Sequence, residues 1–192
     1  MFEYVVSVAG RIGAAPFVAS ASLFAVGYLF SYPIVSHEVS LLTWYPLRVW
    51  RCVRETVSPG DPWHRLFFFL LGFNSASLLV NFLSGFTVVL PPVFAFLLGL
   101  NVGVITVEEA GFAGLVGIAA NPVAWLEVPA ACTSLAIGFR LAESVVGTSD
   151  TVETFVHLSG VYFFIVLPLV VSAAFLEASL IRLAGVADTE AV

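Results

Sequence analysis

The segment Asn121-Pro-Val-Ala-Trp-Leu-Glu-Val-Pro-Ala-Ala-Cys132 places a carboxylate, Glu127, in a stretch that otherwise suits a lipid environment. A carboxylate at bilayer depth is costly, so it normally faces a protein interior or a hydrated cavity and marks a functional site. Glu177, in the segment Ala173-Ala-Phe-Leu-Glu-Ala-Ser179, repeats this anomaly near the other end of the chain. Two such residues in one small membrane protein predict a buried polar site.

The composition around these segments defines the class of protein. Of the 192 residues, 60% are hydrophobic and only 10% are charged, and the mean hydropathy is +1.04. A soluble domain of this size cannot bury so much apolar surface, so we expect an integral membrane protein with a single domain over residues 1–192. Apolar runs of about 20 residues predict helices rather than a barrel, which gives an all-α polytopic fold.

The apolar runs predict about five transmembrane helices and one shorter helical piece. We expect the spans at residues 14–35, 66–90, 92–107, 122–141 and 157–181. Residues 110–120 are also apolar, but eleven helical residues reach only about 16 Å, against a hydrocarbon core of about 30 Å. They therefore predict a half-helix or re-entrant segment. A full crossing by residues 106–126 would make the number of spans six.

Residues 38–65 differ from the rest of the chain because they hold four of its seven arginines. After Pro46, apolar and charged side chains separate onto opposite sides of a helix. The apolar side has Leu47, Val49, Trp50 and Val53, and the other side has Arg48, Arg51, Arg54 and Glu55. This partition predicts an interfacial amphipathic helix, and the arginine excess predicts the cytoplasmic face of the cell membrane. We favour a topology anchor over a partner-binding helix.

Polar side chains recur along one face of the second span. They are Asn74, Ser77, Asn81 and Ser84, at spacings of three, four and three residues. A polar stripe in lipid usually faces other helices and forms hydrogen bonds across the interface, at roughly 1 kcal/mol per contact. The stripe therefore favours helix–helix adhesion over the wall of a transport pathway. Together with Asn101 in the third span, Asn74 and Asn81 join Glu127 and Glu177 as candidate ligand- or ion-binding residues.

Small side chains form a ridge on the third span. Ala95, Gly99 and Gly103 are each four residues apart, so they share one side of a helix. Such a small-residue ridge lets a second backbone approach closely. We expect a tight helix–helix contact there, either within the bundle or between two copies of the chain.

Four short motifs in residues 66–182 resemble those of the stage II sporulation protein M family. They are Phe73-Asn74 followed by Phe82, Gly85 and Pro91-Pro92; Phe96-Leu-Leu-Gly-Leu-Asn-Val-Gly103; Pro122-x-x-x-x-Glu127-Val-Pro129-Ala; and Phe175-Leu-Glu177-Ala. The element from Pro122 to Glu127 is the most specific of them. The resemblance implies a small polytopic membrane fold in which Glu127 and Glu177 matter.

The family resemblance also bears on function. Members in spore formers act as membrane scaffolds for enzymes that remodel the cell wall, so the resemblance implies a scaffold role. This chain departs from the family pattern at Val123-Ala124, where the family has His-Gly. A site that needs that imidazole cannot work in the same way here.

Three classes of function remain in order of preference. The first is a non-enzymatic scaffold or assembly protein, in which Glu127 is either a functional group or a neutral structural carboxyl. The second is a small transporter or channel that uses Glu127 and Glu177 as an intramembrane proton or ion site. The third is an intramembrane hydrolase, which is disfavoured because neither HExxH nor Gly-x-Ser-x-Gly occurs.

The sequence also predicts what the protein binds. We expect no cofactor and no metal, because the three histidines and two cysteines are scattered without ligand spacing. The net charge of −6 excludes nucleic acid, which requires a basic surface. The expected partners are the lipid bilayer and other membrane proteins, with further copies of the chain as an alternative.

Overall fold

The computed structural model describes residues 10, 13–147 and 149–190, and none of these residues lies in a strand. The helices are α2 (Ala14–Ser36), α3 (Ser40–Thr56), α4 (Trp63–Leu83), α5 (Leu90–Gly117), α6 (Ala124–Val146), α7 (Thr151–Val161) and α8 (Leu167–Glu190). Short 3₁₀ turns η1 (Ser84–Phe86) and η2 (Ile118–Ala120) follow α4 and α5, and a π-helical turn η3 (Tyr162–Val166) joins α7 to α8. The predicted all-α class is confirmed.

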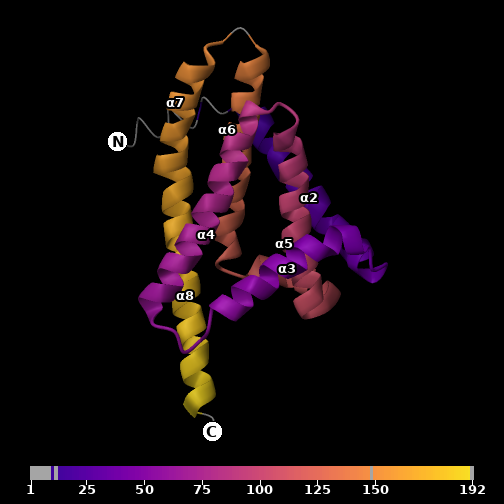
Figure 1. Ribbon diagram of the computed structural model, residues 1–192, viewed down its shortest axis with the longest axis vertical. Coiled ribbons are helices and arrows are strands. Elements are labelled where there is room, and N and C mark those ends of the chain that lie inside the picture. The colour runs from indigo at the N-terminus through magenta and orange to yellow at the C-terminus, as the bar shows by residue number, and fades with distance from the viewer. Residues whose placement is uncertain (1–9, 11–12, 148, 191–192) are drawn as a thin grey trace.

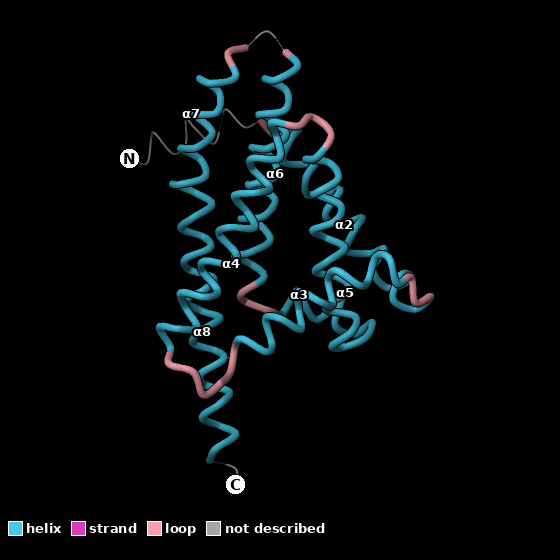
Figure 2. Tube along the Cα trace, in the orientation of Figure 1, coloured by secondary structure: helices cyan, strands magenta, loops and turns pink. Residues whose placement is uncertain are grey.

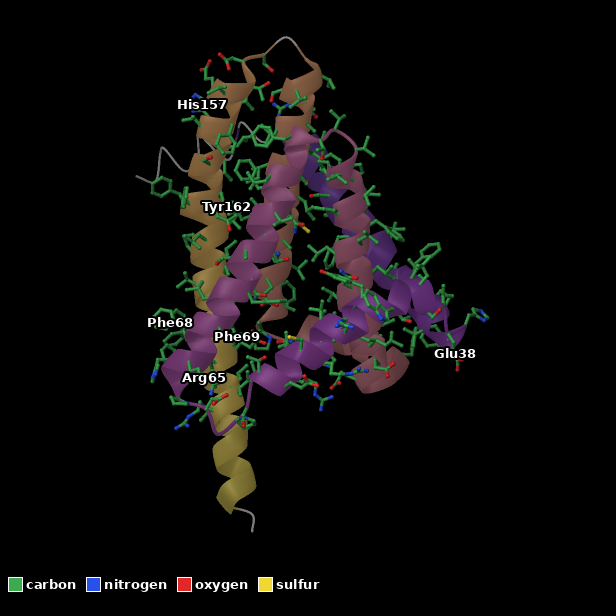
Figure 3. The ribbon with its side chains drawn as sticks, in the orientation of Figure 1. Glu38, Arg65, Phe68, Phe69, His157 and Tyr162 are labelled. Atoms are coloured by element: carbon green, nitrogen blue, oxygen red, sulfur yellow. The ribbon has the colours of Figure 1, made fainter. Side chains whose placement is uncertain are left out.

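The long helices run along the long axis of the molecule, whereas α3 crosses them near one end (Figure 1). We call this the α3 end. It also holds the loop before α4 and the start of α6, and the C-terminal part of α8 extends beyond it. The opposite end, called the far end, holds the turns from α4 to α5 and from α6 to α7 (Figure 2). In Figure 3, Arg65 lies toward the α3 end and His157 toward the far end.

Four helical stretches among the described residues are long and apolar enough to cross a membrane. They are Ala14–Ser36, Trp63–Phe86, Leu90–Ala120 and Thr151–Ala184. These stretches correspond to the spans expected at 14–35, 66–90, 92–107 and 157–181, with longer helices than predicted for the last two. The expected span at 122–141 corresponds to α6, which is not among the four. Its three charged residues lower its hydropathy, and the number of crossings stays a prediction.

Helix α6 is the centre of the bundle. Every residue from 130 to 138 is buried, and α6 contacts α2, α4, α5, α7 and α8. Small side chains make this enclosure possible, since Ala130, Ala131, Ala136 and Gly138 leave room for neighbouring helices on several sides. On the α4 and α7–α8 side, α6 contributes Ile137 and Leu141 to the main hydrophobic core.

Helices α2 and α5 cross with their backbones in direct contact. A Cβ atom added to Gly99 would lie 1.9 Å from the carbonyl oxygen of Phe24, and one added to Gly27 would lie 2.0 Å from that of Phe96. Gly103 is similarly close to Tyr28, and Ala95 is fully buried. The small-residue ridge therefore faces α2 within one chain, and a larger side chain at Gly99 would separate the two backbones.

The chain breaks sharply near the end of α5. Gly111 has φ 61° and ψ −157°, a conformation that side-chain-bearing residues rarely adopt. Beyond this residue, the end of α5 and η2 turn at the α3 end before the chain enters α6 (Figure 1). The hydroxyl of Tyr28 donates a hydrogen bond to the carbonyl of Leu115 at 3.0 Å and holds the turned piece against α2. The short segment expected at 110–120 lies largely beyond this break.

Candidate functional site

The site is built around the first turn of α6. The side chain of Asn121 accepts a hydrogen bond from the backbone N–H of Val123 at 3.0 Å, which forms a turn just before the helix begins at Ala124. Glu127 then lies in the first helical turn, where the free N–H groups and the helix dipole favour a negative side chain. Local backbone chemistry therefore places this carboxylate at the α3 end of the bundle.

Glu127 contacts polar groups from two other helices. Asn74 of α4 donates a hydrogen bond from Nδ2 to Glu127 Oε1 at 2.8 Å. Glu177 of α8 lies close enough to Glu127 for the two carboxylates to interact electrostatically. Neither glutamate forms an ion pair within the described part of the chain. Because a partly buried carboxylate needs compensation, this acidic pair is an unusual arrangement for a purely structural element.

A cavity of about 650 Å³ opens beside Glu127. Most of its polar lining lies toward the α3 end and consists of Trp50, Asn74, Glu109, Asn121 and Glu127, with Ser77 and Thr106 about one helical turn further in. Toward the middle of the bundle its walls are mainly apolar and include Phe24, Leu78, Leu98, Ala131 and Val170. No residue that lines it is basic. The cavity thus has a polar, acidic end and an apolar end.

Helix α3 is fastened across the α3 end of this cavity. Trp50 Nε1 donates a hydrogen bond to Glu109 Oε1 at 2.8 Å, and Arg54 Nη1 forms an ion pair with the same oxygen at 2.9 Å. Trp50 and Arg54 are four residues apart and therefore share one side of α3. Glu109 was not among the candidate site residues predicted from the sequence. The four-residue spacing of Trp50 and Arg54 was a sequence signal for a shared contact. Their acceptor, Glu109, could not be identified before the fold was known.

Comparison with known protein families agrees with this architecture. The family model described as stage II sporulation protein M matches residues 20–180. The chain belongs to this family. No curated protein and no solved structure matches the chain. The matched region of this stage II sporulation protein M family member includes Asn74, Glu127 and Glu177.

The other two candidate asparagines of this family member lie away from the carboxylates. Asn81 is buried where α4 meets Gly138 of α6, and its Nδ2 has no hydrogen-bond partner. Asn101 is half-buried on α5 and does not line the cavity. The structure therefore brings Asn74, Glu127 and Glu177 together, whereas Asn81 and Asn101 are separate from them.

The position that carries the family's imidazole has a different role in this member. Val123 is buried, and its backbone N–H makes the hydrogen bond to Asn121. Ala124 lines the cavity. In the described part of the chain, no three His, Cys, Asp or Glu side chains gather as a metal site would require. The polar side chains that line the cavity are carboxylates, amides, hydroxyls and one indole.

Proposed function

We propose that this stage II sporulation protein M family member is a non-enzymatic membrane scaffold or assembly protein with a buried polar site at Glu127. The observation that carries the proposal is the one-sidedness of that site. Its polar groups gather at the α3 end, and the cavity beside them becomes apolar toward the middle of the bundle. A proton or ion pathway needs polar groups or water on both sides of any apolar constriction.

Beyond the cavity, contacts between α4 and α6 close the interior. The Ser134 hydroxyl donates a hydrogen bond to the carbonyl of Leu78 at 2.5 Å. A Cβ atom added to Gly138 would lie 2.8 Å from the carbonyl oxygen of Asn81, and one added to Gly85 would lie 2.3 Å from the carbonyl oxygen of Gly138. Small residues and backbone carbonyls of α4, η1 and α6 therefore close the interior at the far end, which supports a scaffold over a transporter.

Reconstitution into vesicles tests this proposal against proton or ion transport. Wild-type protein and the Glu127→Gln variant are compared with empty vesicles, using a pH-sensitive or cation-sensitive dye. We expect no flux above empty vesicles from either protein. Glutamine preserves size and can still accept the hydrogen bond from Asn74, so the fold should survive. Wild-type flux that disappears in Glu127→Gln would reject the scaffold proposal and favour an intramembrane carboxylate relay.

We also propose that α3 lies along the cytoplasmic surface of the membrane. Its tryptophans and arginines suit a headgroup layer. The native cysteine Cys52 allows the position of α3 to be tested. Cys52 on α3 is exposed, whereas Cys132 on α6 is buried. A membrane-impermeant maleimide should label Cys52 only after intact cells are opened, and Cys52→Ser should abolish the signal. Labelling of Cys52 in sealed cells would reverse the topology.

A further inference from the structure

The cavity beside Glu127 has the properties of a ligand site rather than of a packing defect. At about 650 Å³ it falls within the range of roughly 300–1,000 Å³ that small-molecule pockets occupy. Its lining comes from α2, α3, α4, α5, α6 and α8, so it is formed by the whole bundle. It combines apolar walls with a few polar groups at one end, which is the usual composition of a ligand pocket.

Two acceptor atoms at the polar end of the cavity have no donor. Asn74 donates through Nδ2 to Glu127 Oε1, which leaves Asn74 Oδ1 and Glu127 Oε2 without a hydrogen bond from any described residue. Neither atom is fully buried, and both residues line the cavity. A ligand that meets these two oxygens must therefore bring hydrogen-bond donors.

The charges around these atoms specify the ligand further. Glu127 and Glu109 line the cavity and Glu177 lies close to Glu127, while no basic side chain is among the lining residues. Arg54 lies nearby but pairs with Glu109. A cation would be attracted, whereas a phosphate or carboxylate would meet repulsion and find no partner. A free amine therefore suits this end of the cavity better than a zwitterionic phospholipid headgroup, whose phosphate would have no partner among the lining residues.

We propose that this cavity binds an amphipathic amine, with its ammonium group at Glu127 and Asn74 and its apolar chain toward Phe24, Leu78 and Val170. An ammonium has three donors and no acceptor, so it can satisfy Glu127 Oε2 and Asn74 Oδ1 at once. Its apolar chain then occupies the mainly apolar part of the cavity. This inference does not depend on the scaffold role, because binding requires no flux and no partner protein.

Photolabelling of the full-length protein in phospholipid nanodiscs tests the proposal. The probe is dodecylammonium with a diazirine at the far end of the chain, and the matched probe is dodecanol with the same diazirine. We expect saturable labelling of cavity residues near Leu78 and Leu98 by the ammonium probe alone, read by mass spectrometry. Unlabelled dodecylammonium should compete, and added phosphatidylethanolamine should not. Equal labelling by the alcohol, or competition by the phospholipid, would overturn the proposal.

Two variants test separately whether binding depends on the charge of Glu127 and on the shape of the cavity. Glu127→Gln should weaken binding of the ammonium probe by about tenfold or more, because hydrogen bonds to a charged group are stronger than those to a neutral group. Glu143→Gln, at the exposed other end of α6, is the matched control and should bind like wild type. Val102→Phe should block the cavity while retaining Glu127. Folded Glu127→Gln and Val102→Phe proteins that both bind normally would refute the proposal. Accumulation of the probe inside vesicles beyond that in empty vesicles would reject the scaffold role and leave the binding site intact.

Discussion

Helices α4 and α6 meet in two different ways at the two ends of the molecule. Toward the far end their backbones are in contact through Gly138, with η1 packed on α6 through Gly85. Toward the α3 end the same two helices are bridged by the side chains of Asn74 and Glu127, and a cavity lies beside them. One helix pair thus provides both a close backbone contact and the wall of an open cavity.

The difference shows how residue size controls where a membrane protein can be hollow. Where glycine and serine line the interface, backbones approach until carbonyl oxygens are in contact and no room is left. Where asparagine and glutamate line it, their longer side chains and mutual hydrogen bond hold the helices apart. A polar site in this bundle therefore lies where the small-residue interface ends.

Replacing Gly85 by leucine should cause the largest loss of stability. A Cβ atom at this position would lie 2.3 Å from the carbonyl oxygen of Gly138 and 2.7 Å from Cβ of Leu141, so the 3₁₀ turn and α6 must separate. We expect a loss of about 3 kcal/mol, at the upper range for overpacking, measured by thermal unfolding in detergent. Gly72→Leu is the matched control, because a Cβ atom at Gly72 meets nothing within 4 Å. Similar melting temperatures for the two variants would show that the far end is not tightly packed.

Replacing Asn74 by leucine should have an intermediate effect at the α3 end. It removes the only hydrogen bond that a described residue donates to the Glu127 side chain, and leaving such a group unsatisfied costs about 1–3 kcal/mol. The double variant Asn74→Leu/Glu127→Leu removes both polar partners and should recover most of this loss. The four proteins of this cycle are compared by unfolding in detergent. Additive losses in the double variant would show that the two side chains are not coupled.

Replacing Glu109 by glutamine should have the smallest effect on stability. It removes an ion pair with Arg54 whose side chains are 63% and 41% exposed, and exposed pairs contribute roughly 0–1 kcal/mol. Glutamine retains an oxygen that can accept the hydrogen bond from Trp50. We expect a change below about 1 kcal/mol that shrinks further as salt is raised. A loss as large as that of Asn74→Leu would mean that α3 stabilises the bundle, rather than only covering the site.

Much of the fold could be predicted from local patterns in the chain. Apolar runs near bilayer length indicated the long helices, since length and hydropathy are local properties. The separation of arginine from apolar residues after Pro46 indicated a helix there, and α3 extends six residues further toward the N-terminus. The free-energy cost of placing a carboxylate in lipid singled out Glu127 before its neighbours were known.

The limits of that reasoning appear in the asparagine stripe. Helical periodicity placed Asn74 and Asn81 on the same side of α4, but seven residues separate them by about 10 Å along the axis. They cannot both reach one carboxylate, so Asn74 bonds Glu127 and Asn81 lies against Gly138. Periodicity specifies a face of a helix, and it contains no information about which part of that face meets which neighbour.

The amino-acid pattern thus determined the helical membrane class and the helix after Pro46, and it singled out Glu127 as a candidate, because each depends on residues close together in the chain. Long-range packing decided that Glu127 meets Asn74 and Glu177, that Glu109 fastens α3, and that a cavity lies between them. Those features depend on how α3, α4, α5, α6 and α8 lie relative to one another at the α3 end. Residues far apart in the chain set that arrangement, so no single segment encodes it.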